Sequence, residues 1–154
     1  LMIKQKRISV FGGRDITQKI YDETVQIGEF LAIEGYRVFC GGGKGVMEAI
    51  AKGVSQKNGT IIGILKGQDL SESNEYISLP IATGIGIARN AILAYNCDVA
   101  IAISGKYGTM SEIAYAFQLE KSVIGYKTWD IDNVIHANSP EDVIIKLKRE
   151  LENV

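Results

Sequence analysis

The chain has 154 residues, 46% of them hydrophobic, and its 17 Lys and Arg against 18 Asp and Glu give a formal net charge of −1. That length suits one buried core and is too short for two comfortable ones, so we expect a single domain over residues 1–154. The balanced charge argues against nucleic acid as the main partner, because such proteins normally cluster basic residues on one face.

Several other classes are disfavoured by the composition. The sequence has neither an apolar run of membrane-spanning length nor a targeting segment, so we expect a cytoplasmic protein without a membrane partner. Cys40 and Cys97 are interpreted as reduced core residues. No paired His or Cys spacing suggests a metal site, and the single histidine, His136, lies near no obvious nucleophile. We therefore expect no metal.

Strand and helix patterns alternate along the chain. In chain order, the expected strands are residues 8–11, 36–40, 60–65, 77–83, 98–103, 122–126 and 134–137. The expected helices among them are residues 20–34, 46–54, 85–95, 110–119 and 139–151. Pro80 favours an edge position for its strand, and residues 15–18 have the spacing of a capping box. The alternation predicts a doubly wound, Rossmann-like α/β fold, with a mainly parallel sheet of about 6–7 strands and helices on both faces.

Four of the expected strands end in glycine-rich turns, at residues 11–13, 41–45, 83–86 and 104–109. Tight turns need glycine whatever their role. In a parallel sheet, however, these turns share one carboxyl edge, where helix N-termini present unpaired N–H groups. The four turns together predict a phosphate-binding edge. The polar stretch 66–74 is the longest irregular piece and a candidate active-site loop.

The glycine turns do not fit the common nucleotide motifs. Lys44 is not followed by the Ser or Thr of a P-loop, and the second strand ends in Cys40 rather than in a ribose-binding acid. Charged residues near helix starts remain as candidates: Arg14, Glu48, Arg89 and Glu112. Thr109 and Glu112 have capping-box spacing, which would explain both without a function. Arg89 lies on an otherwise apolar helix and needs an acid or a ligand phosphate as its partner.

Three segments resemble the signatures of the LOG-like proteins, a group often labelled possible lysine decarboxylase. This group is related to DprA/Smf and similar to the molybdenum cofactor carrier proteins. The segments are Gly41-Gly42-Gly43-Lys44-Gly45-Val46-Met47-Glu48-Ala49, Thr83-Gly84-Ile85-Gly86-Ile87-Ala88-Arg89-Asn90 and Gly105-Lys106-Tyr107-Gly108-Thr109-Met110-Ser111-Glu112. The resemblance covers nearly the whole chain in the same order.

The resemblance implies a nucleoside 5′-monophosphate phosphoribohydrolase, which releases the free base and ribose 5-phosphate. By that resemblance Arg89 and Glu112 would be the catalytic pair. The implied phosphate and nucleotide site consists of Gly13, Arg14, Gly42, Gly43, Gly45, Met47, Glu48, Asn90, Gly105, Gly108 and Thr109. No cofactor is implied for the hydrolase. No lysine is placed for a pyridoxal Schiff base, so the decarboxylase label gains no support.

The chain also departs from the family pattern. Ser104-Gly105-Lys106 stands where the family has Pro-Gly-Gly, and Asn90 replaces the lysine of an Arg-Lys pair. These departures leave open an alternative, a non-catalytic carrier or sensor that binds a nucleotide or a molybdopterin-type cofactor. In both interpretations the partner is a small phosphorylated ligand. Residues 85–96 and 110–119 carry more apolar surface than one sheet face can cover, which predicts a homodimer or homotetramer with the site near the subunit boundary.

Overall fold

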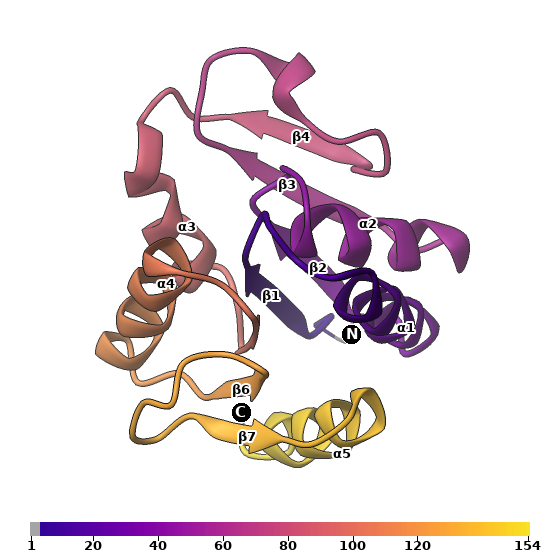
Figure 1. Cartoon of the computed structure of the whole chain (residues 1–154), viewed down its shortest axis with the longest axis vertical. Coiled ribbons are helices and arrows are strands. Elements are labelled where there is room, and N and C mark those ends of the chain that lie inside the picture. The colour runs from indigo at the N-terminus through magenta and orange to yellow at the C-terminus, as the bar shows by residue number, and fades with distance from the viewer. Residues whose placement is uncertain (1–3) are drawn as a thin grey trace.

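A computed structural model describes residues 4–154 of the chain (Figure 1). Its seven strands form one parallel sheet in the order β4-β3-β2-β1-β5-β6-β7. The strands are β1 (Arg7–Gly12), β2 (Arg37–Cys40), β3 (Ile61–Leu65), β4 (Leu79–Ala82), β5 (Val99–Ile103), β6 (Val123–Tyr126) and β7 (Ile135–Ala137). The helices are α1 (Gln18–Ile33), α2 (Val46–Gln56), α3 (Arg89–Tyr95), α4 (Tyr107–Gln118) and α5 (Pro140–Leu151). Two short 3-10 turns, η1 (Leu70–Glu72) and η2 (Gly86–Ala88), complete the fold.

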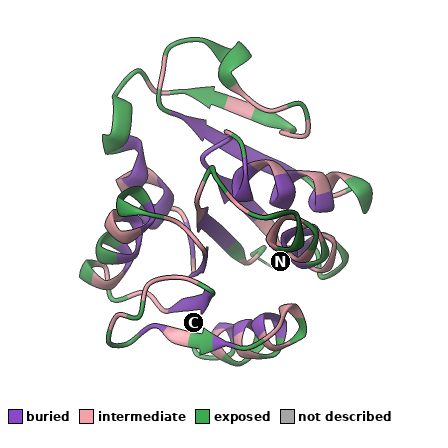
Figure 2. Ribbon diagram, viewed as in Figure 1, coloured by how far each residue is buried: buried purple, intermediate pink, exposed green. Residues whose placement is uncertain are grey.

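The predicted Rossmann-like fold is confirmed, with helices on both sheet faces. Figure 1 shows α1, α2 and α5 on one side of the strands and α3 and α4 on the other. Successive residues of β1 alternate between two apolar cores, with Ile8 and Val10 facing α1, α2 and α5 and Phe11 facing α3 and α4. Strands covered on both faces are expected to be apolar throughout, and every residue of β5 is buried. Figure 2 shows this buried centre and the more exposed edge strand β4, the edge position that Pro80 predicts.

Most helix ends follow the sequence signals. Gly35 follows α1 at φ +76°, and Ser139 caps α5 by accepting a hydrogen bond from the Asp142 N–H at 3.0 Å. The predicted capping box at residues 15–18 is wrong in detail, since the N-cap of α1 is Thr17, whose hydroxyl accepts from the Ile20 N–H at 3.2 Å. The irregular path of the Gly13 to Thr17 segment moves the helix start two residues along the chain.

Two predicted helices differ in the structure. The helix expected over residues 85–95 divides into η2 and the seven-residue α3, and Ile87 in η2 is 78% exposed. The α4 helix begins at Tyr107 with Lys106 as its N-cap, so Thr109 and Glu112 lie inside the helix. The capping-box interpretation of these two residues is therefore wrong. The positive φ angles of Ser104 (+53°) and Gly105 (+96°) turn the chain early and let the helix start sooner.

The remaining sequence predictions concern single residues and absences. Cys40 and Cys97 are free and buried, and His136 lies on β7 with its Nε2 3.4 Å from the Asp130 Oδ1. Within residues 4–154, no helix is long and apolar enough to cross a membrane. The same residues contain no cluster of three or more His, Cys, Asp or Glu side chains that could hold a metal ion.

Candidate functional site

A cavity of about 610 Å³ lies at the carboxyl edge of the sheet, where the strand order reverses between β1 and β5. Ligands of open α/β sheets characteristically bind at such a reversal. The turns after β1, β2 and β5 all reach the cavity, and so do the starts of α3 and α4. Ten of the predicted site residues line it: Gly13, Arg14, Gly43, Met47, Arg89, Asn90, Gly105, Gly108, Thr109 and Glu112. The structure thus brings together residues that lie up to about a hundred positions apart in the sequence, from Gly13 to Glu112.

The turn after β2 is held by hydrogen bonds to its carbonyl groups. The Arg89 Nη1 donates to the Gly41 carbonyl at 2.7 Å, and the Asn74 Nδ2 donates to the Gly42 and Gly43 carbonyls at 3.2 and 2.8 Å. Gly42 itself does not line the cavity, because its φ of +76° places it against β3. A Cβ at Gly42 would lie 2.5 Å from the Leu65 Cδ2. Gly42 therefore shapes the turn without facing a ligand.

Two more predicted site residues, Gly45 and Glu48, also lie outside the cavity lining. Gly45 is the N-cap of α2 at φ +67°, and a Cβ there would approach the Gly13 carbonyl oxygen to 2.4 Å. The next residue, Val46, donates its N–H to that same carbonyl at 2.9 Å. The start of α2 is therefore closed against the β1–α1 turn. Glu48 instead lies near Tyr21, and burial together with this carboxylate raises the pKa of Tyr21 to about 12.

The start of α4 is open to the cavity. Met110 is the first residue whose N–H bonds back along the helix, to the Lys106 carbonyl at 3.0 Å. The preceding N–H groups belong to the first turn of α4, where no intrahelical acceptor exists. Gly105 fits tightly here, because a Cβ would lie 2.0 Å from the Thr109 Oγ1, and Gly13 packs its backbone against it. Donors at a helix start, next to the positive end of the helix dipole, suit a phosphate group.

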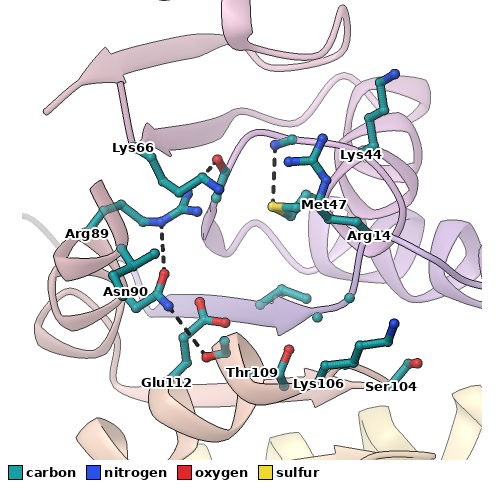
Figure 3. A pocket seen from close by; sticks show the side chains of 18 of the residues that line it. Arg14, Lys44, Met47, Lys66, Arg89, Asn90, Ser104, Lys106, Thr109 and Glu112 are labelled. Carbon is teal, nitrogen blue, oxygen red and sulfur yellow. Dashed lines mark hydrogen bonds between the residues drawn. The ribbon is translucent and has the colours of Figure 1, made fainter. Parts of the chain in front are cut away.

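Arg89 is buried and tied to the protein backbone (Figure 3). Its Nη1 donates to the Ile64 carbonyl at 2.6 Å as well as to Gly41, and its Nε donates to the Asn90 Oδ1 at 2.9 Å. The hydrogen-bond partners of Arg89 are thus two backbone carbonyls and an amide. The sequence had suggested an acid or a ligand phosphate instead. Burial lowers the pKa of Arg89, and the Glu112 carboxylate opposes that shift.

Glu112, from the neighbouring helix α4, is buried in the cavity wall, with 7% of its surface exposed. Burial raises the pKa of its carboxyl group from an ordinary 4.5 to about 8, and the nearby Arg89 charge only partly offsets this. At neutral pH the protonated form therefore predominates. A carboxyl group in this state can give up a proton, but it supplies little negative charge to a neighbouring reaction.

A model of the SLOG cluster4 family matches residues 5–153. The chain belongs to this family. An uncharacterized protein of Archaeoglobus fulgidus is 38% identical over 126 residues, which are 81% of this chain and 82% of that protein. The resemblance to the LOG-like, DprA and cofactor carrier group is thereby confirmed.

Two solved structures show the same fold at moderate sequence identity. The molybdenum cofactor binding protein of Rippkaea orientalis is 31% identical, with a TM-score of 0.91 over 97% of this chain and 99% of the other. The molybdenum cofactor carrier protein of Chlamydomonas reinhardtii is 28% identical, with a TM-score of 0.89 over 97% and 99%. Both likenesses extend over nearly the full length of each chain.

The predicted site residues include only two of the cations that line this family member's cavity, Arg14 and Arg89, and omit the three lysines. Five cationic side chains line it, from Arg14, Lys44, Lys66, Arg89 and Lys106, together with three acidic residues, Asp15, Glu72 and Glu112. Lys66 and Glu72 come from the irregular stretch 66–74 that the sequence marks as a candidate loop. Lys66 follows β3 directly, so its place at the carboxyl end of a strand is the signal that could have identified it.

Proposed function

We propose that this protein binds a small phosphorylated ligand in the cavity between β1 and β5, and that it carries a molybdopterin-type cofactor or a nucleotide without converting it. The observation that supports this most is the set of five cations around the cavity of a chain whose net charge is −1. Concentrating positive charge at one concave place favours an anionic ligand. The phosphate would lie at the start of α4, on the first-turn N–H groups and near Lys106.

The ligand's ring system would contact the apolar part of the same lining. Val10, Leu65 and Ile87 line the cavity beside the charged groups. A volume of about 610 Å³ is within the usual range for small-molecule sites. The names of the Rippkaea and Chlamydomonas proteins, which refer to binding and carrying the molybdenum cofactor, support a pterin-type ligand for this relative.

The inferred partner is a small molecule rather than nucleic acid. The cations line a concave site with glycine backbone between them, whereas a nucleic-acid backbone is normally met by a basic outer face. We expect duplex or single-stranded DNA to bind more weakly than AMP at physiological salt. Tight DNA binding would contradict this inference.

A second candidate function is the phosphoribohydrolase implied by the LOG-like signatures. The buried Glu112 in the cavity wall favours it, because a carboxylate can stabilise the oxocarbenium-like state of N-glycosidic cleavage. Two observations argue against the hydrolase. The pKa of Glu112 near 8 leaves most of the carboxyl groups uncharged at neutral pH, and Arg89 is already bonded to three protein acceptors.

Calorimetry with inorganic phosphate, AMP and ribose 5-phosphate tests the binding proposal, and chromatography of the AMP mixture for free adenine tests hydrolysis. Acid oxidation of freshly purified protein should release a fluorescent pterin if that cofactor is carried. Lys66→Ala should weaken binding, whereas Lys57→Ala, on a cation at the end of α2 outside the cavity, should not. Catalytic release of adenine would favour the hydrolase over the carrier. Absence of binding to every probe, and of pterin, would refute both.

A further inference from the structure

One backbone N–H group in the cavity wall already donates a hydrogen bond to a side chain of the protein. The Gly43 N–H donates to the Met47 Sδ, with 3.4 Å between nitrogen and sulfur (Figure 3). Met47 lies in the first turn of α2, and its side chain lies against the glycine turn. Both Gly43 and Met47 line the cavity, and Met47 is 9% exposed. The Met47 sulfur thus accepts a hydrogen bond from an N–H group that could otherwise donate to a ligand oxygen.

The direction of the Gly43 N–H does not depend on Met47. Asn74 holds the carbonyls of Gly42 and Gly43, and Arg89 holds the carbonyl of Gly41. Gly42 is packed against β3 in a conformation that favours glycine. With its carbonyls held in this way, the turn keeps presenting the Gly43 amide when the methionine side chain moves.

A thioether sulfur is a poor match for this donor. It is a weak hydrogen-bond acceptor, whereas bonds to anionic oxygens are about twice as strong as neutral ones. The methionine side chain has three rotatable bonds and adapts easily to new neighbours. Arg14 and Lys44 lie on the same side of the cavity as Met47 in Figure 3. Positive charge there would assist an anionic oxygen in displacing the sulfur.

We propose that Met47 is a displaceable placeholder for a second ligand-binding position, the Gly43 amide. Its sulfur satisfies the Gly43 N–H before the ligand binds and gives way to an acceptor oxygen of the ligand. The ligand then accepts hydrogen bonds from backbone N–H groups at two places in the cavity, the start of α4 and the turn after β2. The ligand class is a phosphorylated molecule with a second anionic or carbonyl oxygen. This inference rests on the proposed binding of a phosphorylated ligand at the start of α4.

The experiment is an NMR titration of protein labelled with ¹⁵N and with ¹³C in the methionine methyl groups. Inorganic phosphate and AMP are added separately to millimolar concentration. Amide signals of Gly108 and Thr109 report on the start of α4, while the Gly43 amide and the Met47 methyl report on the placeholder. We expect all four signals to move with at least one probe, because displacement changes both partners of the N–H···S bond. The wild-type protein suffices for this measurement.

Substitution gives an independent measurement with a matched control. Met47→Leu keeps an apolar side chain of similar size but removes the sulfur acceptor, so AMP no longer competes with it. We expect binding to tighten about 2- to 10-fold, the range of one modest hydrogen bond. Met110→Leu makes the same chemical change in α4 outside the cavity lining and should leave the affinity unchanged.

The outcomes separate the two proposals. If Gly108 and Thr109 respond to a probe while Gly43 and Met47 do not, the placeholder is refuted and the binding function stands. An unchanged affinity in Met47→Leu also refutes the placeholder. If none of the four signals responds to phosphate or AMP, and acid oxidation of the same protein releases no pterin, both proposals fail.

Discussion

The Nε of Arg89 donates to the Oδ1 of Asn90 at 2.9 Å, and the Nδ2 of Asn90 donates onward to the Ser111 Oγ at 3.1 Å. One amide therefore links the start of α3 to the first turns of α4 beside the cavity. The LOG-like pattern has a lysine at the position of Asn90, and a lysine could not accept a hydrogen bond from Arg89. Asn90 thus serves as an orienting group for the arginine.

Replacing Asn90 by alanine should destabilise the protein. The change leaves the buried Arg89 Nε without its acceptor, and leaving a charged donor unpaired costs about 1–3 kcal/mol. Urea unfolding followed by circular dichroism would measure this loss. Asn153→Ala, on an exposed residue near the end of the chain, is the control and should be neutral. Equal unfolding midpoints for the two variants would show that the hydrogen bond from Arg89 to the Asn90 amide does not stabilise the protein.

Gly105→Ala should disturb the start of α4 more than its backbone angle alone requires. A Cβ at Gly105 would lie 2.0 Å from the Thr109 Oγ1, whereas a Cβ at Gly35, also at positive φ, would meet nothing within 4 Å. Both substitutions carry the left-handed penalty of about 1–2 kcal/mol. Only Gly105→Ala should add a steric cost and lose phosphate binding, as thermal unfolding and calorimetry would measure. Similar losses of stability in the two variants, with binding retained, would contradict the assigned packing.

The fold was accessible from sequence because its signals are local and repeated. Fully apolar strands such as residues 99–103, and caps such as Ser139, report on their own neighbourhood. The errors arose where a local signal competed with the turn beside it. Thr109 and Glu112 have capping-box spacing, yet the positive φ of Ser104 and Gly105 starts the helix earlier. No periodicity reveals a backbone angle of a non-glycine residue such as Ser104.

The site was only partly accessible, since motifs identify residue types and not the direction of a side chain. The glycines of both major turns were predicted, but Gly42 and Gly45 face the protein because β3 and the β1–α1 turn pack against them. Asn74 lies in an irregular segment and contributes to the site through hydrogen bonds to a turn about thirty residues away. Such a long-range role leaves no local pattern. The sequence therefore predicted where the cavity lies, but it did not predict which individual residues contact a ligand there.

Trp129→Phe should weaken ligand binding without unfolding the protein. The Trp129 Nε1 donates to the Lys106 carbonyl at 2.8 Å, and its ring stacks on Tyr107 with centroids 6.0 Å apart. Phenylalanine keeps an aromatic ring but loses the donor, so the turn that carries Lys106 becomes less fixed. We expect the affinity for AMP to fall about fivefold, equivalent to about 1 kcal/mol. Tyr115→Phe, on an exposed face of α4, is the control in the same calorimetric assay. An affinity that Trp129→Phe leaves intact would exclude this positioning role.

The protein should be a homodimer, or a tetramer built from it, as its apolar surface around α3 and α4 indicates. Large exposed apolar side chains there are Ile87, Tyr95, Tyr107 and Tyr115. Light scattering at micromolar concentration should therefore give at least twice the 16.8 kDa monomer mass. Tyr115→Glu should shift the population toward monomer, because a charge opposes burial of this face. Ile145→Glu, on α5 at the opposite sheet face, should not. A monomeric wild-type protein would rule this assembly out.

Glu112 should make the stability of the protein depend on pH. Its pKa near 8 in the folded protein, against an ordinary 4.5, means that the folded state holds a proton between these values which the unfolded chain releases. The free energy of unfolding should therefore fall as the pH rises from about 4.5 to about 8 and level off above that.

Glu112→Gln removes this titration while it keeps the side-chain shape. Relative to wild type, the variant should gain stability across the same pH window, by an amount on the order of 4 kcal/mol at pH 9 compared with pH 4.5. Urea unfolding of both proteins at several pH values measures the difference, and a difference that stays constant with pH would disprove the shifted pKa. In a carrier the variant should still bind AMP. In a hydrolase it should bind AMP and lose turnover, and wild-type turnover should rise with pH toward 8, because cleavage needs the ionised carboxylate that the amide cannot supply.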